Sequence, residues 1–157
     1  MDITQDSVAR EVGHWFFSEY LATWATIGAT SASPEGVLDY WGVPMHAASA
    51  RLNRWLMTQE AVLGLLEANH APLKAAGYTH TAVIDRSITA YNENAVAIDV
   101  IWSRRRADDS EIERLATHFE IHRTDDGWRV IALASTPTSK SSLADVWPRT
   151  TGPSAAA

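Results

Sequence analysis

Arg86, His80 and Tyr20 are the three side chains of this sequence whose chemistry best suits work inside an apolar pocket. Arg86 carries a permanent positive charge that could polarise a substrate oxygen or hold an anion. His80 titrates near neutral pH, so it could serve as a general base. The Tyr20 hydroxyl could donate a hydrogen bond to a ligand carbonyl. We therefore treat Arg86, His80 and Tyr20 as candidate catalytic residues.

Each of these residues also has a structural explanation. Arg86 could pair with a carboxylate such as Asp39 or Glu60, because a buried charge without a partner is costly. A histidine at the rim of a strand could simply be solvated, and a tyrosine in the core could bond to the backbone. An inward-facing Arg86 requires a carboxylate or a ligand oxyanion within contact distance in either case.

A second polar pattern, His118-x-Glu120-x-His122, places three possible metal ligands on one face of a strand. Alternate residues of a strand stand ~6.6 Å apart, so adjacent pairs could share a metal but all three could not converge. Asp99 is expected opposite His118, as a cross-strand ion pair or as a carboxylate that orients a base. We predict ion pairs or interface contacts here and no metal site.

Composition excludes several classes of function. The 157 residues contain no cysteine, which excludes disulfides, cysteine-ligated zinc and thiol nucleophiles. Their 13 basic and 19 acidic residues give a net charge of −6, which disfavours nucleic-acid binding. The first residues lack the pattern of a signal peptide, and no apolar stretch approaches the ~20 residues of a membrane span. We expect a single cytoplasmic domain with no membrane contact and no cofactor.

The N-terminal half predicts helices. Apolar residues recur at steps of three and four from residue 7 to about residue 28, which indicates a long amphipathic helix with an aromatic face. Residues 38–44 suggest a short edge strand, since Pro44 cannot donate to a ladder. A second helix should begin after Thr58, which can cap it, and end at Gly77, with a kink or a separate turn at Pro72.

The C-terminal half changes to a period typical of strands. Residues 79–91, 95–105, 111–124 and 128–136 are rich in β-branched and aromatic residues, with turn residues between them. Helices followed by an antiparallel meander predict an α+β fold in which a curved sheet wraps around the N-terminal helices. Residues 1–137 form this domain, and residues 138–157 are expected to be a flexible tail.

The turns predict which side chains face the helices. A loop at 125–127 pairs Thr124 with Trp128, and this leaves Trp128 and Val130 on the outer face. A loop at 92–94 turns His80 and Arg86 inward; a two-residue loop would turn Asp85 inward instead, and both registers remain open. The inner face also receives several residues from the two central strands: Val96, Ile98, Val100, Trp102, Arg104, Leu115, Thr117, Phe119 and Ile121.

Four short motifs accompany this order of elements. They are Tyr40-Trp41-x-x-Pro44, Ala76-Gly77-Tyr78 before the sheet, Trp102-x-Arg104, and Arg123-Thr124-x-Asp126-Gly127-Trp128-Arg129-Val130 near the end. With them, about residues 7–137 resemble the SnoaL-like, or nuclear-transport-factor-2-like, superfamily. This resemblance implies a cone-shaped α+β barrel with an apolar pocket, commonly a homodimer through the outer face of the sheet.

Enzymes of this superfamily include ketosteroid isomerases, polyketide cyclases, limonene-epoxide hydrolases and scytalone dehydratases, but their catalytic acids do not carry over. Tyr20 matches the helix tyrosine of the isomerases, while Ala48 and Thr117 stand near the positions of their two acids. Arg86 could match the arginine of the epoxide hydrolases, although Ile84 and Ile88 stand where carboxylates would be expected. The resemblance therefore specifies a fold more firmly than a reaction.

Two functions remain open at this point. The first is a cofactor-independent isomerase, cyclase, dehydratase or epoxide hydrolase, in which Arg86 polarises an oxygen and His80 or Tyr20 moves a proton. The second is a binding or dimeric structural module whose pocket turns nothing over. A hydrophobic small molecule and a second copy of the chain are the expected partners. The residues expected to bind the small molecule are Trp15, Trp24, Tyr40, Trp102, Thr117 and Phe119.

Overall fold

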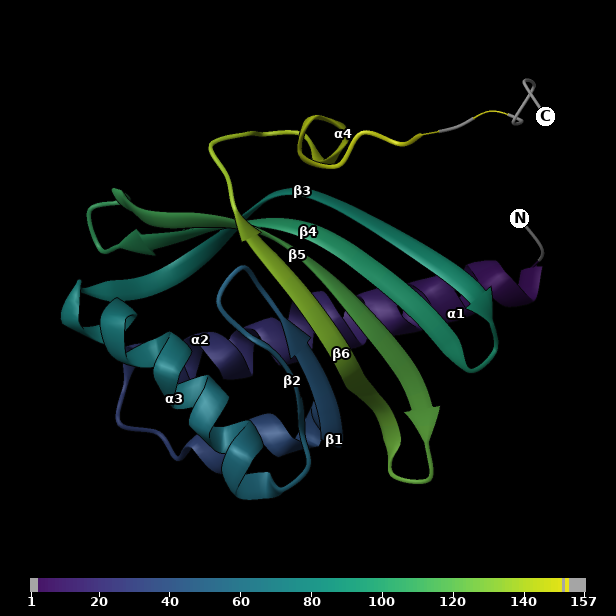
Figure 1. Cartoon of the computed structure of the whole chain (residues 1–157), viewed down its shortest axis with the longest axis horizontal. Helices are drawn as coiled ribbons and strands as arrows, with labels where there is room; N and C mark the ends of the chain where they lie inside the picture. Colours follow the sequence, from purple (N-terminus) through teal and green to yellow (C-terminus); the bar gives the residue numbers. More distant parts are fainter. Residues whose placement is uncertain (1–2, 151, 153–157) are drawn as a thin grey trace.

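One long helix opens the structure. The computed structural model describes residues 3–150 and 152. Helix α1 (Ile3–His14) continues through a π-helical segment (Trp15–Tyr20) into helix α2 (Leu21–Ala29), close to the predicted bounds (Figure 1). Most buried residues of this helix recur at steps of four, which exceed the 3.6-residue turn; the wider π turn keeps the later ones on the inner side. These residues are Val8, Val12, Phe16, Tyr20, Trp24 and Ile27.

A short hairpin and a second long helix follow. A 3-10 turn (Pro34–Asp39) leads to strand β1 (Trp41–Ala48), strand β2 (Asn53–Leu56) and helix α3 (Gln59–Ala75). The predicted cap is confirmed, because Thr58 Oγ1 accepts a hydrogen bond of 3.1 Å from the α3 backbone. The prediction of an edge strand at 38–44 is wrong. Strand β1 lies inside the sheet, and β2 is the edge strand.

The six strands form one sheet in the order β2-β1-β6-β5-β4-β3. All neighbouring pairs are antiparallel except β1 and β6, which are parallel. The long helix and α3 pack on one face of this sheet, so the predicted α+β architecture is confirmed (Figure 1). The four long strands are β3 (Tyr78–Asn92), β4 (Ala95–Arg106), β5 (Glu111–Thr124) and β6 (Gly127–Pro137).

The alternation of inward and outward side chains reverses partway along strand β3. Its turn has two residues, but a bulge beside Asn92 restores the register expected for the longer loop, and Arg86 pairs with Val100. A second irregularity between Val83 and Asp85 then reverses the alternation. Beyond it Thr81 pairs with Arg104 on the helix-facing side, and His80 pairs with Arg105 on the other side. The prediction that His80 faces the helices is therefore wrong.

The β5–β6 hairpin also differs from the prediction near its tip. Thr124 pairs with Gly127 across a two-residue turn, and an irregularity beside Glu120 absorbs the difference. Trp128 and Val130 are consequently buried rather than on the outer face, and Trp128 Nε1 donates a 3.1 Å hydrogen bond to Glu11 of helix α1. Farther from the turn the predicted register holds.

The chain after Pro137 crosses the outer face of the sheet. Short helix α4 (Leu143–Val146) lies on the opposite side of the sheet from α3 (Figure 1). Asp85 Oδ2 accepts a 2.8 Å hydrogen bond from the Leu143 backbone, and Arg114 binds the Lys140 carbonyl at 3.2 Å and Ser141 Oγ at 2.9 Å. We call residues 138–147 the C-terminal strap. Of the predicted flexible tail, residues 140, 141 and 143 thus contact the sheet, while residues 151 and 153–157 lie outside the described residues.

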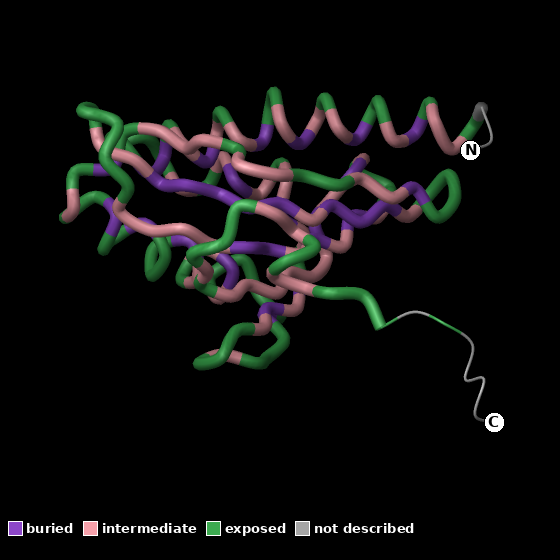
Figure 2. Tube along the Cα trace, turned by 90° about the horizontal axis from the view of Figure 1, so that it is seen from above, coloured by how far each residue is buried: buried purple, intermediate pink, exposed green. Residues whose placement is uncertain are grey.

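Burial follows this layering. Buried positions run along the inner side of the long helix and through the middle of the strands, while exposed positions dominate the turns (Figure 2). Within the described residues, no helix is both long and apolar enough to cross a membrane. The buried apolar residues pack between the helices and the sheet, around a cavity.

Candidate functional site

A cavity of about 290 Å³ lies between the helices and the sheet. Its inner wall is aromatic, and its exposed lining residues, Asn69 and Pro72 of α3 among them, mark the side that opens to solvent. Other lining residues come from the ends of β4, β5 and β6 and from the β1–β2 turn. The aromatic wall consists of Tyr20, Trp24, Trp41, Trp102 and Phe119.

Tyr20 belongs to the π-helical segment, and its ring contacts Phe119 at a centroid distance of 6.2 Å. Trp41 Nε1 donates a 3.1 Å hydrogen bond to Tyr20 Oη. Burial raises the pKa of Tyr20, so the hydroxyl keeps its proton at any ordinary pH. Because the hydroxyl already accepts from Trp41, it has its own proton left to donate to a ligand oxygen.

Arg104 is the charged group of the aromatic wall. Its side chain is only 6% exposed, and Cζ lies 3.9 Å from the Trp24 ring centroid and 5.0 Å from that of Trp102. Nη1 donates a 2.8 Å hydrogen bond to Thr81 Oγ1, whereas Nε has no partner among the described residues. Burial lowers the pKa of Arg104, but a guanidinium remains charged in proteins. The cavity therefore holds a fixed positive charge.

Glu113 supplies the carboxyl group. It pairs with Arg104 in the β4–β5 register and lines the cavity, yet among the described residues its side chain makes neither an ion pair nor a hydrogen bond. Burial is the main reason that the pKa of Glu113 is raised, and the nearby Arg104 charge opposes this effect. Deeper in the cavity the Thr117 and Ser135 hydroxyls bond to each other at 3.1 Å.

Comparison with known families decides the classification. Residues 10–138 match the family described as NTF2-like protein (DUF6841). The chain belongs to this family. The resemblance inferred from the sequence motifs is thereby confirmed. No curated protein matches the chain in sequence.

Solved structures share the fold at low sequence identity. An NTF2-like protein with a cystatin-like fold from Novosphingobium aromaticivorans is 16% identical, with a TM-score of 0.61 over 92% of this chain and 96% of that one. A cystatin-like fold protein from Burkholderia xenovorans is 14% identical, with a TM-score of 0.62 over 89% and 98%. The yeast UBP3-associated protein BRE5 is 10% identical, with a TM-score of 0.61 over 83% and 97%. Likeness at this level shows the fold alone.

The NTF2-like cavity brings together five of the predicted site residues: Tyr20, Trp24, Trp102, Thr117 and Phe119. Two others lie behind its wall. Trp15 and Tyr40 pack against each other with ring centroids 5.5 Å apart, and neither lines the cavity. Their expected contact with a ligand is therefore not supported by their position, while the roles of the five lining residues stay predictions.

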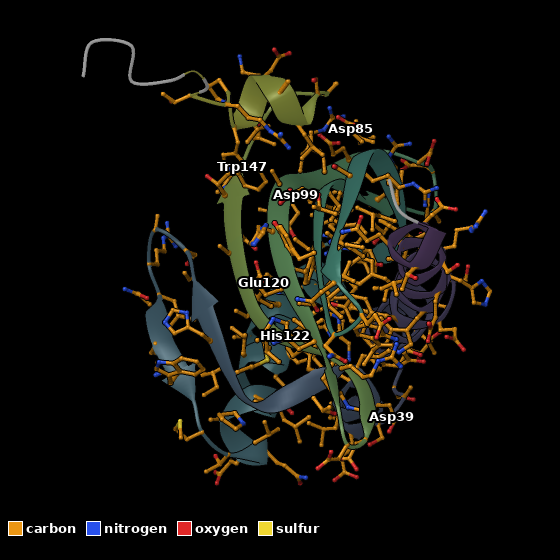
Figure 3. All side chains as sticks on the ribbon, turned by 90° about the vertical axis from the view of Figure 1, so that its right-hand side faces the viewer. Asp39, Asp85, Asp99, Glu120, His122 and Trp147 are labelled. Carbon is orange, nitrogen blue, oxygen red and sulfur yellow. The ribbon has the colours of Figure 1, made fainter. Side chains whose placement is uncertain are left out.

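Arg86 and His80 lie outside the cavity, which corrects their expected placement. Arg86 does face the helices, but it is exposed on edge strand β3, and its Cζ lies 4.6 Å from the Phe17 ring centroid. An aromatic ring thus takes the place of the expected carboxylate. Asp39, one of the suggested partners, lies at the far end of the molecule from Asp85, the neighbour of Arg86 (Figure 3).

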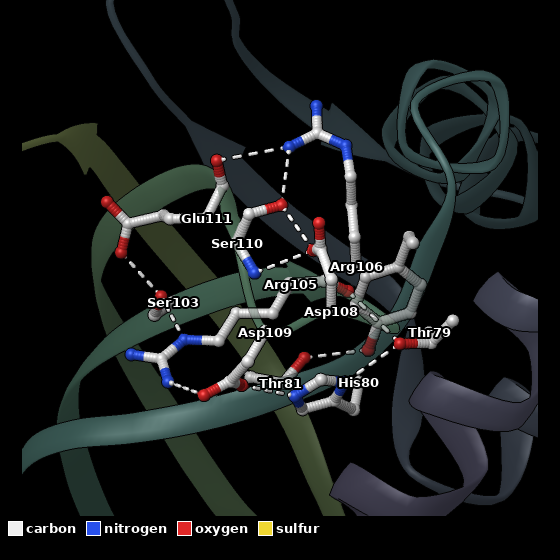
Figure 4. Close-up of polar contacts among 11 residues, drawn as sticks. Thr79, His80, Thr81, Ser103, Arg105, Arg106, Asp108, Asp109, Ser110 and Glu111 are labelled. Atoms are coloured by element: carbon white, nitrogen blue, oxygen red, sulfur yellow. Dashed lines mark hydrogen bonds and ion pairs between the residues drawn. The ribbon is translucent and has the colours of Figure 1, made fainter.

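His80 instead anchors the β4–β5 turn. Its Nε2 lies 2.8 Å from Asp109 Oδ1, and its Nδ1 lies 2.8 Å from Thr79 Oγ1 (Figure 4). Arg105 Nη1 also donates to Asp109 at 3.2 Å, and the hydrogen bonds from His80 and Arg105 hold the pKa of Asp109 below its usual range. These hydrogen bonds hold the exposed β4–β5 turn and account for the position of His80 without a ligand.

On the outer face of the sheet, His118 and Asp99 form the predicted cross-strand pair. His118 Nδ1 lies 2.7 Å from Asp99, its Nε2 lies 3.0 Å from Glu120, and His122 is 3.7 Å from Glu120. Asp99, Glu120 and His122 lie along the strands on the side away from α1 (Figure 3). The hydrogen bond to Asp99 is the main reason that the pKa of His118 is raised. Within residues 3–150 and 152, no three His, Asp or Glu side chains converge on a possible metal position.

Sequence reasoning missed the two charged residues of the cavity. Arg104 was placed on the inner face, but it was not weighed as a functional group. Glu113 precedes Leu115 and Thr117 at steps of two residues along the same strand. The strand period therefore predicts that its side chain shares their face of the sheet.

Proposed function

We propose that the cavity binds a small, largely apolar molecule. The observation that carries this proposal is the cavity, open on one side, in which Tyr20, Trp24 and Trp102 line one wall. Its volume of about 290 Å³ is close to the lower end of small-ligand pockets, ~300–1,000 Å³. Aromatic walls with a few polar groups are the usual lining of such pockets.

Blocking the mouth of the cavity tests this proposal. Ala68 is an exposed lining residue of α3, so Ala68→Phe should narrow the opening without disturbing the core. The probe is 1-indanone, a neutral bicyclic ketone, followed by NMR of the seven tryptophan indole N–H groups. We expect shifts at Trp24, Trp41 and Trp102 and none at Trp55, and Ala68→Phe should weaken binding by about tenfold or more.

The matched control is Ala75→Phe, which adds the same ring at an exposed position of α3 that does not line the cavity. This variant should bind 1-indanone as the unmodified chain does. Shifts confined to Trp55, or equal affinities in the two variants, would place the probe elsewhere and contradict the proposal.

A second candidate function is proton transfer on such a ligand, and the unpaired Glu113 carboxyl favours it. A carboxylate with a raised pKa in an apolar site is a suitable general base, and Arg104 beside it could stabilise an oxyanion. Glu113 would take a proton from the carbon next to a carbonyl group. The resulting enolate oxygen would receive hydrogen bonds from Arg104, and the proton would return from Glu113 to the carbon.

Hydrogen exchange into 1-indanone tests proton transfer directly. In D₂O, the chain should exchange the hydrogens next to the carbonyl faster than buffer does, as measured by mass spectrometry. Glu113→Gln should reduce this excess rate by roughly 10²-fold or more, because the amide cannot accept the proton. The same variant should still shift the cavity tryptophans. An undiminished exchange rate would exclude Glu113 as the base.

A further inference from the structure

The guanidinium of Arg104 is buried but incompletely bonded. Of its five N–H donors, one on Nη1 binds Thr81, and Nε is a buried donor without a partner in the described part of the chain. Within residues 3–150 and 152 Arg104 makes no ion pair, and its other polar contact is a hydrogen bond with the Tyr78 side chain. The Nε donor is therefore unused, in a residue that is 6% exposed.

The surroundings position this charge without neutralising it. Trp24 and Trp102 hold the guanidinium by cation–π contacts, and Thr81 fixes the Nη1 edge. Leaving such a group buried without an anion is unfavourable unless a partner arrives from solvent. Because Arg104 lines the cavity, the cavity is the route by which that partner would arrive.

We propose that Arg104 is a binding site for the carboxylate of an apolar acid, an inference that rests on the proposed binding function. The edge of the guanidinium that carries the unpartnered Nε matches the two oxygens of a carboxylate in a bidentate pair. The aromatic wall beside it suits the apolar body of the acid. A doubly charged group such as a phosphate fits less well, because a single arginine faces it and the Glu113 carboxyl stands on the next strand.

A pair of isosteric ligands tests the charge preference. The probes are 2-naphthoate and 2-naphthamide, which share a body and differ in charge; calorimetry at pH 7 gives both affinities. The chain should bind 2-naphthoate about tenfold more tightly than the amide, or better, since hydrogen bonds between charged groups are stronger than neutral ones. Arg104→Met, which keeps the stem of the side chain, should abolish this preference while retaining the amide.

Arg86→Met is the matched control. Arg86 is also a helix-facing arginine held against an aromatic ring, but it lies outside the cavity, so its loss should leave the preference unchanged. Arg104→Lys should keep only part of the preference, because an ammonium cannot form the two-pronged pair. NMR of the Arg104 Nε–H group gives an independent readout: its signal should move on addition of 2-naphthoate and much less with the amide.

The possible failures are distinguishable. If the chain binds both naphthalene ligands equally, or if Arg104→Met keeps the preference, the carboxylate site is refuted while the apolar cavity stands. If neither 2-naphthamide nor 1-indanone binds, the proposed function itself fails, and the carboxylate site fails with it. Amide binding by Arg104→Met shows that the variant is folded, so a lost preference cannot be attributed to unfolding.

Discussion

Replacing Trp102 with alanine is expected to lower the free energy of unfolding by roughly 3 to 5 kcal/mol. Trp102 is 2% exposed, and its ring lies 5.8 Å from Phe16 and 6.0 Å from Phe119. It also forms one of the two aromatic faces that hold Arg104. The substitution removes a large buried surface and leaves a hole between the helix and the sheet. Urea denaturation followed by circular dichroism measures the loss.

Trp55→Ala provides the matched control for this prediction. Trp55 is 60% exposed on edge strand β2 and contacts the His46 ring at 5.1 Å. Its removal should change the free energy of unfolding by only about 0.5 kcal/mol or less, as is usual for surface positions. If the two variants lose similar stability, Trp102 does not have the central packing role that the structure gives it.

The stability of the chain should also fall on acidification because of His70. This residue is 3% exposed, its Nε2 has no hydrogen-bond partner among the described residues, and its ring centroid lies 4.1 Å from that of Trp24. Burial, followed by the charges of Lys74 and Arg104, lowers the pKa of His70 to about 4. The unfolded chain binds this proton near pH 6.5, well before the folded chain does.

His70 therefore contributes full stability above about pH 6.5, and this contribution decreases as the pH falls toward 4. The shift corresponds to a loss of up to about 3 kcal/mol over that interval. His70→Phe keeps a ring on Trp24 but cannot bind a proton, so its denaturation midpoint should depend less on pH between 6.5 and 4.5. His118 has a raised pKa and acts in the opposite direction, and it is present in both chains. Parallel pH profiles of the two chains would contradict the assignment.

The residues of the cavity wall were largely predictable from alternation along the strands. Trp102, Thr117 and Phe119 occupy the predicted face, because long runs of alternating apolar residues leave only one register with a buried side. His80 was misplaced because a strand irregularity between Val83 and Asp85 reverses the alternation. Packing against the helices selects the position of such a bulge, and no local residue pattern marks it.

The importance of Arg104 could not be read from its own strand. Arg86 and Arg104 both face the helices, yet one is exposed and the other is buried. The difference arises from coverage: Arg86 lies on an edge strand beside Phe17, whereas Trp24 from α2 covers Arg104 on the second strand. The contact between Trp24 and Arg104 joins residues 80 positions apart in the sequence. Only the folded structure therefore shows which of the two arginines is shielded from solvent.

The C-terminal strap shows that the folding unit is longer than the segment by which the family is recognised. The family match ends at residue 138, but Ile101 and Ala116 point to the outer face of the sheet and are fully buried. The strap is the part of the described chain that crosses this face, fastened at Asp85 and Arg114. A fragment trimmed to the match would leave this second apolar layer in water. Production of the isolated domain, or its fusion to another protein, should therefore keep the chain at least through residue 147.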